Sequence, residues 1–166
     1  MPRLIKDGSL IEDEWICVEK DSDSAGVTET DAEQVLVHIK DWLSHKDALN
    51  QSGKTIGVWL DSDDDPYELI NDISELPLIA VNFPVFMDGR SFSTAAIIRE
   101  RLSFQGELRA IGDVIRDQVF YMKKCGINSF EVRDGADPEE ILMALGDFSD
   151  SYQSTVETPE PLFRRR

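Results

Sequence analysis

Six arginines lie in residues 83–133, the one stretch of the chain where basic residues outnumber acidic ones. They are Arg90, Arg99, Arg101, Arg109, Arg116 and Arg133. A guanidinium group binds carboxylate, phosphate or sulfur oxyanions through paired hydrogen bonds, so this cluster could form an anion-binding site. The alternative is that the arginines form ion pairs with nearby acidic side chains, which is common on helices. The partners expected for such pairs are Asp88, Glu100, Glu107, Asp113 and Asp117.

The residues that we predict to bind an anion follow apolar runs of the sequence. Asp88, Gly89, Arg90 and Ser91 come after one run, and Gly112 and Asp113 come after the next. Helices expected to begin after Arg90 and after Gly112 would add backbone N–H donors and the positive end of the helix dipole. The sequence therefore predicts a site for a small oxyanion formed by Asp88, Gly89, Arg90, Ser91, Arg109, Gly112, Asp113 and Arg133.

Other patterns that could carry chemistry have a structural explanation. The acidic run 61–65 does not fit a calcium loop, because Pro66 stands where that loop needs glycine and Asp72 where it needs glutamate. These acids fit better as caps of a following helix. His38 and His45 lack the remaining ligands of a metal shell, so no metal site is predicted.

No cofactor is evident from the sequence, so the sequence leaves the cofactor unknown. The sequence contains no glycine-rich phosphate loop and no GxSxG nucleophile turn. Cys125 lies beside Lys123 and Lys124, which could lower its pKa, but a buried structural cysteine before the helix-ending Gly126 is the favoured interpretation. These residues therefore predict neither nucleotide chemistry nor a catalytic triad.

Four strand–helix units follow one another after Gly53. The predicted strands are residues 56–60, 78–83, 107–111 and 129–133, and the predicted helices start near Pro66, Ser91 or Ser93, Val114 and Pro138. This alternation predicts an α/β fold with a mainly parallel sheet, either open or half-barrel-like. Ligands bind such sheets at the carboxyl ends of the strands, where the predicted anion site lies.

The remaining segments give the domain organisation. Residues 1–18 predict a hairpin between Leu4-Ile5 and the run 15–18, and the acidic, serine-rich segment 19–30 predicts a mobile loop. Val35, Ile39, Trp42 and Leu43 then recur at helical spacing, although residues 35–37 could begin as a strand. We expect a single α/β domain over residues 31–148 and a loose tail over 149–166.

Composition limits the classes of function. The chain has 166 residues, 41% of them apolar, and a formal net charge of −16. Such a charge repels phosphate backbones and anionic lipids, so we expect no nucleic-acid or membrane partner. Two distant cysteines and the absence of a leader-like or membrane-spanning run predict a cytoplasmic protein.

The central motif resembles a known family. It comprises the segments 86–93, 99–101, 106–114, 117–118 and 124–127. These segments are similar to bacterial proteins with a domain of unknown function that are encoded beside sulfite reductase and commonly labelled probable oxidoreductases of sulfite reduction. The resemblance extends more loosely over residues 35–148 and assigns no catalytic residue. Its motif positions outside the predicted anion site are Arg99, Arg101, Asp117, Gln118, Cys125 and Gly126.

The resemblance implies two alternative functions in assimilatory sulfite reduction. One is an oxidoreductase or redox accessory that holds a sulfur oxyanion, although no catalytic motif is visible. The other is a non-catalytic anion-binding or docking module for sulfite reductase or another sulfur-assimilation enzyme. A homodimer is a further open alternative, because a half-barrel could pair with a second copy.

Overall fold

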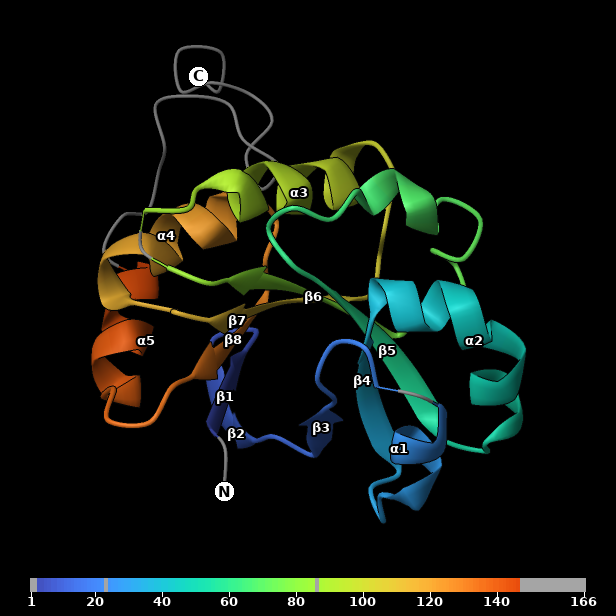
Figure 1. Cartoon of the computed structure of the whole chain (residues 1–166). Coiled ribbons are helices and arrows are strands. Elements are labelled where there is room, and N and C mark those ends of the chain that lie inside the picture. Colours follow the sequence, from blue (N-terminus) through green and yellow to red (C-terminus); the bar gives the residue numbers. More distant parts are fainter. Residues whose placement is uncertain (1–2, 23, 86, 147–166) are drawn as a thin grey trace.

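The computed structural model describes residues 3–22, 24–85 and 87–146, and the tail predicted over residues 149–166 lies outside this part (Figure 1). The strands are β1 (Arg3–Lys6), β2 (Ser9–Glu12), β3 (Trp15–Cys17), β4 (Gln34–His38), β5 (Thr55–Leu60), β6 (Leu78–Phe83), β7 (Glu107–Gly112) and β8 (Ser129–Val132). The helices are α1 (Ser24–Glu29), α2 (Ile39–Gln51), the 3₁₀ helix η1 (Pro66–Leu69), α3 (Arg90–Glu100), α4 (Arg116–Lys124) and α5 (Pro138–Gly146).

The strands form one curled sheet in the order β2-β1-β8-β7-β6-β5-β4-β3. Neighbours from β3 to β8 pair parallel, whereas β1 pairs antiparallel with both β8 and β2. Helices α2, α3 and α4 lie along the outer side of the curl, as Figure 1 shows. The predicted α/β fold with a mainly parallel sheet is therefore confirmed, in its half-barrel form.

The central strands are buried on both faces. Their outer face packs with the helices in the main core, and their inner face carries a smaller cluster. That inner cluster consists of Leu36, Trp59, Leu78, Ala80 and Ile111, with Trp15 packed against it. Burial on both faces explains why these strands read as nearly continuous apolar runs. Five apolar residues of the four predicted strands are each at most 7% exposed: Val58, Ile79, Val81, Ile111 and Val132.

The N-terminal hairpin exists, but the prediction of its second strand is wrong. β1 turns at Asp7 and Gly8, both with positive φ, and pairs with β2 in the register Leu4 to Ile11. The run predicted as its partner is β3, which pairs parallel with β4 at the other edge of the sheet. The link between β2 and β3, residues 13–14, therefore joins the two edges of the curled sheet.

Two further segments differ from the sequence predictions. The segment 19–30 contains helix α1, whose Val27 is only 2% exposed, so one apolar contact orders part of the predicted loop. The segment around Val35 and Val37 is strand β4 rather than helix, because β3 and β5 supply backbone partners on both sides. Helix α2 begins directly afterwards, with His38 as its N-cap.

Helix starts also differ from the predictions. After Asp65 only the short η1 forms, and residues 70–75 continue as turns instead of a helix. The N-cap of α3 is Gly89 rather than Ser91 or Ser93, and α4 begins at Arg116 rather than directly after Gly112. Among the described residues, no helix is long and apolar enough to cross a membrane.

Candidate functional site

Polar side chains gather where the parallel strands β4 to β8 end. We call this group the polar edge. The carboxyl ends of parallel strands meet at one edge of a sheet, which places side chains from four loops near one another. The residues of the polar edge are His38, Asp61, Ser62, Asp64, Asn82, Asp88, Arg90, Ser91, Gly112, Asp113 and Arg133.

One hydrogen-bonded chain fixes the loop after β5. His38 Nδ1 accepts from the backbone N–H of Lys40, so Nε2 carries the proton and donates to Asp64 Oδ2 over 2.7 Å. Asp64 Oδ2 also accepts from the backbone N–H of Asp61, and Asp61 Oδ1 accepts from Asn82 Nδ2. His38 is fully buried, so it positions this loop and does not face a ligand.

Arg90 forms a fork with Asp88. Its Nε and Nη2 donate to the two Asp88 carboxylate oxygens over 3.0 and 2.8 Å, and Nη2 also donates to Ser62 Oγ. Hydrogen bonds from Arg90, and then from Ser62, hold the pKa of the Asp88 carboxyl well below its usual range. The Arg90 side chain is 63% exposed, so this ion pair lies at the surface.

Ser91, Gly112 and Asp113 meet around the end of β6. Ser91 Oγ donates to the carbonyl of Asn82, and the Asp113 backbone N–H donates to the carbonyl of Phe83 over 2.7 Å. Gly112 has φ +87°, and a Cβ built there would lie 2.3 Å from Asn82 Oδ1. The structure therefore brings these three predicted residues to one edge, although they are about twenty residues apart in sequence.

The other predicted arginines divide into two groups. Arg133 lies at the polar edge and forms an ion pair with Asp113. Arg109 projects from the inner face of the sheet, is 2% exposed, and pairs with Asp13 and Glu107. Its side chain therefore cannot join Arg90 in one anion site, because it faces the inside of the curl.

The remaining motif positions have structural roles or lie on the surface. Arg99 donates to the carbonyls of Phe104, Gly106 and Gly126, and so ties α3 to the turns before β7 and β8. Cys125 is buried, as the favoured interpretation predicts, and this burial raises its pKa to about 11. The positions that the helices expose or leave partly exposed are Arg101, Asp117 and Gln118.

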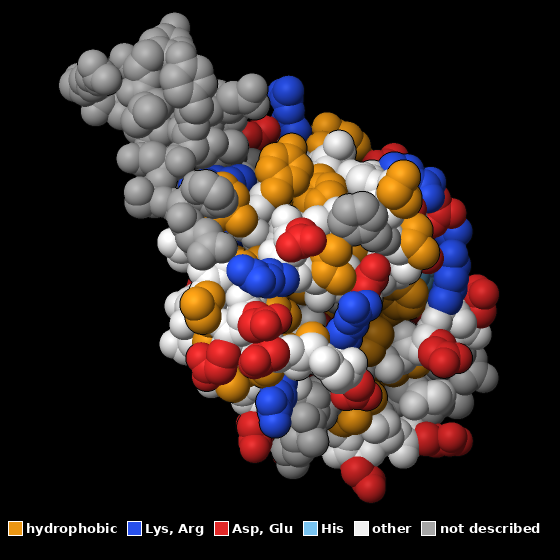
Figure 2. All heavy atoms as spheres, turned by 90° about the vertical axis from the view of Figure 1, so that its left-hand side faces the viewer, with side chains coloured by type: hydrophobic (Ala, Val, Ile, Leu, Met, Phe, Trp, Pro, Cys, Tyr) orange, Lys and Arg blue, Asp and Glu red, His pale blue; other side chains and the backbone are white. Residues whose placement is uncertain are grey.

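The geometry of the polar edge favours the ion-pair alternative over an oxyanion site. Arg90 and Arg133 direct donors at carboxylates of this chain, so an incoming anion would compete with Asp88 and Asp113. Figure 2 shows the same relation on one face, where Lys and Arg side chains lie beside Asp and Glu side chains. Oxyanion binding by the named residues stays a prediction.

Ser62 and Asn82 were not predicted as site residues from the sequence, and His38 and Asp64 were given other roles. Asn82 connects Asp61 to Ser91 through its side chain and its carbonyl. Asn82 is the one polar residue in the apolar run 78–83, and this exception could have indicated that it belongs to the site. Ser62 had no comparable signal, because its contact with Arg90 depends on how two loops meet.

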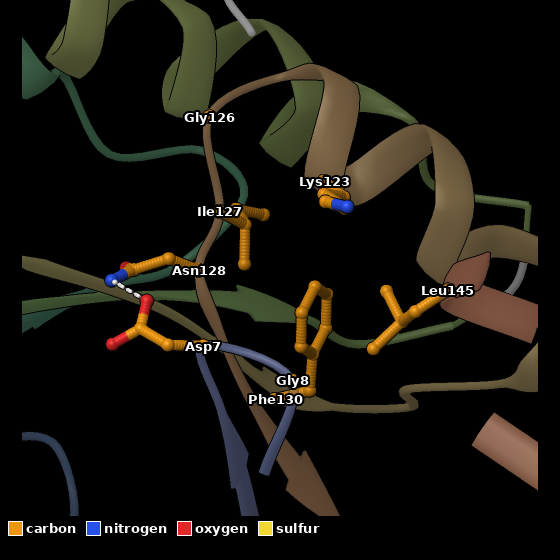
Figure 3. Close-up of a pocket in the computed structure, with 8 residues that line it drawn as sticks. All are labelled: Asp7, Gly8, Lys123, Gly126, Ile127, Asn128, Phe130 and Leu145. Atoms are coloured by element: carbon orange, nitrogen blue, oxygen red, sulfur yellow. Dashed lines mark hydrogen bonds between the residues drawn. The ribbon is translucent and has the colours of Figure 1, made fainter. Parts of the chain in front are cut away.

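A separate cavity of about 490 Å³ opens at the opposite end of β8 (Figure 3). Figure 3 shows the side chains of Ile127, Phe130 and Leu145 turned toward one another beside Lys123. Asn128 Nδ2 donates to Asp7 Oδ1 at its rim. This lining is mostly apolar and contains no pair of groups arranged for acid–base or nucleophilic chemistry.

The chain was compared with known proteins. A family model described as "Bacterial protein of unknown function (DUF934)" matches residues 57–163. No curated protein matches the chain. The matched range contains every residue of the polar edge except His38, and it leaves out the hairpin, β3 and β4.

Proposed function

The chain belongs to DUF934, a family of bacterial proteins of unknown function, and we propose that it is a non-catalytic accessory protein that docks on sulfite reductase or another sulfur-assimilation enzyme. The main observation that supports this proposal is that exposed apolar side chains lie beside the acidic residues of the polar edge. Val85 and Met87, in the loop between β6 and α3, are 57% and 86% exposed. Met87 directly precedes Asp88, whose partner is Arg90.

Charge at this edge supports attraction to a basic partner. In the described part of the chain, three cations pair with the acidic residues of the four loops, and these are Lys40, Arg90 and Arg133. An acidic surface increases the rate of encounter with a basic one, and exposed methionine supplies apolar contact area. The acidic residues of these loops are Asp61, Asp63, Asp64, Asp65, Asp88, Asp113, Asp134 and Asp137.

The choice of partner and compartment follows from two further points. The resemblance of the motif around Asp88–Ser91 to proteins encoded beside sulfite reductase supports that enzyme as the partner. Cys17 and Cys125 are both free thiols, which suits a reducing compartment, and we place the interaction in the cytoplasm.

The docking proposal predicts that Met87→Ser weakens binding to sulfite reductase of the same bacterium by roughly 5- to 30-fold, the loss typical of a truncated interface anchor. Met143→Ser is the matched control, because Met143 is 69% exposed on α5. Asp63→Lys should also weaken binding, and by less at high salt, since salt screens exposed charges. The measurement is isothermal titration of the two purified proteins at two salt concentrations.

Two outcomes would overturn this proposal. Equal losses for Met87→Ser and Met143→Ser would remove the polar edge as the interface, and no binding by the wild-type chain would remove the docking function. An oxidoreductase is the other function that the resemblance supports. A flavin or metal centre in the absorbance spectrum of the purified protein would favour it instead.

A further inference from the structure

The inner face of the curled sheet encloses a second candidate site, separate from the polar edge. A cavity of about 270 Å³ lies there, near the lower end of the size range of small-molecule sites. We call it the inner cavity. Its lining residues come from β3, β4, β7, β8 and the β2–β3 link, and they are Asp13, Trp15, Ile16, Cys17, Leu36, Arg109, Ile111 and Glu131.

One side of the inner cavity is apolar. Leu36 and Ile111 belong to the inner cluster, and Trp15 packs against that cluster from the edge strand β3. Cys17, which is exposed on the edge strand β3, adds a thiol to this lining. These groups can pack against a short aliphatic or aromatic body.

The other side carries charge, and its one cation already has partners. Arg109 Nη1 donates to both carboxylate oxygens of Asp13 over 3.0 Å, and Nε and Nη2 donate to Glu107 Oε1. In the described part of the chain, the side-chain carboxylate of Glu131 accepts no hydrogen bond, and no residue forms an ion pair with it. Burial, and then the charge of Asp13, raise the pKa of the Glu131 carboxyl, while Arg109 lowers it.

We propose that the inner cavity binds a small organic cation, a primary amine with a short apolar body. The lining contains the two carboxylates of Asp13 and Glu131 and the single guanidinium of Arg109, so one positive charge balances it. An ammonium group would donate to Glu131, and its apolar body would lie against Trp15 and Ile111. An anion would meet a cation whose donors are already used.

The test is titration of the full chain with 2-phenylethylamine and with its uncharged counterpart 2-phenylethanol. We expect saturable binding of the amine, weaker binding of the alcohol, and roughly 10- to 100-fold weaker amine binding by Glu131→Gln, because a hydrogen bond to a charged group is lost. Glu140→Gln is the matched control, because Glu140 is exposed on α5 and its loss changes the net charge equally.

Two results would overturn the inner-cavity proposal. One is the absence of saturable amine binding by the wild-type protein up to millimolar concentration. The other is equal amine affinity of Glu131→Gln and Glu140→Gln, which would show that the net charge of −16, rather than Glu131, attracts the amine. Neither result bears on docking at the polar edge, which is measured with different variants.

Stability without ligand gives a second readout for Glu131. The groups that face it are Arg109 of β7, Asp13 of the link and Cys17 of β3, while Leu4 lies opposite on β1. A carboxyl whose pKa is raised on folding destabilises the native state above its folded pKa, and this cost disappears below its unfolded pKa. Glu131→Gln should therefore raise the melting temperature at pH 7.

The stability gain of Glu131→Gln should vanish below about pH 4, where the wild-type carboxyl is protonated in both states. Thermal unfolding of both proteins between pH 3.5 and 7.5 measures this difference. A variant that melts below wild type at pH 7 would show that Glu131 has a stabilising internal partner. That result would remove the vacant carboxylate on which amine binding depends.

Discussion

Replacing Arg109 by alanine is expected to lower the free energy of unfolding by about 3–5 kcal/mol, the usual cost of removing one member of a buried ion pair. Arg109 is 2% exposed, and its partners Asp13 and Glu107 have side chains only 7% and 9% exposed. Without the guanidinium, both carboxylates stay buried with less compensation. Lys6 remains 2.7 Å from Glu107, but among the described residues no other cation pairs with Asp13.

Urea unfolding measures this loss, and two variants show its origin. Arg116→Ala should change stability by less than about 0.5 kcal/mol, because Arg116 is exposed on α4. Combining Arg109→Met with Asp13→Asn and Glu107→Gln should recover much of the loss, since the two former partners of Arg109 are then uncharged. If Arg109→Ala were no worse than Arg116→Ala, the ion pairs inside the curl would not hold its edges together.

The expected effect is large because of where Arg109 lies in the topology. Asp13 belongs to the link that joins β2 and β3, the two edge strands of the sheet. Glu107, at the start of β7, also pairs with Lys6 of β1. The network therefore connects the centre of the sheet to the link across its opening, and its loss should loosen the inner cavity.

The sequence allowed the ion pairs to be predicted better than the anion site. Asp88, Glu107 and Asp113 were named as partners for the arginines, and the structure pairs them with Arg90, Arg109 and Arg133. These partners lie two residues away along the chain, or one strand away in the sheet. The contact of Arg109 with Asp13 spans 96 residues and could not be read from local spacing.

A similar limit explains which strands were predicted. β5 and β6 are buried on both faces, so their apolar runs indicate strands directly. β4 is also buried, but Val35 and Ile39 fit a helical period, and the strand forms because β3 and β5 pair with it. Pairing partners distant in sequence decided the conformation, and local periodicity did not contain that information.

At the polar edge, too, the pairing of strands could be predicted from the sequence but the contacts of individual side chains could not. Parallel pairing of β6 with β7 was predictable, and it brings the loops carrying Ser91 and Asp113 to one edge. The roles of the individual side chains were not predictable, because they depend on loop conformation. Ser91 was predicted to cap α3, yet its hydroxyl bonds the carbonyl of Asn82 and thereby fixes the start of the helix to the end of β6.

Gly112→Ala is expected to destabilise the protein by about 3 kcal/mol or more, because strained backbone and a steric clash act together. Gly112 has φ +87°, which side-chain-bearing residues rarely adopt. The new Cβ would lie 2.3 Å from Asn82 Oδ1 and 2.7 Å from the backbone oxygen of Phe83. Relief would require separating β7 from β6 at the point where the polar edge is assembled, so the docking proposed for this edge should weaken as well.

Gly135→Ala separates these two causes. Gly135 has φ +84° and no atom within 4 Å of a built Cβ, so this variant should lose only about 1–2 kcal/mol, the cost of the backbone conformation alone. Adding Asn82→Ala to Gly112→Ala should recover only part of the loss, since the contact with the Phe83 carbonyl persists. Urea unfolding of the wild type, the two glycine variants and the double variant measures their free energies of unfolding. Equal decreases in the free energy of unfolding for Gly112→Ala and Gly135→Ala would show that Asn82 and Phe83 move to make room for the new methyl group. Close packing of Gly112 would then not hold the polar edge together.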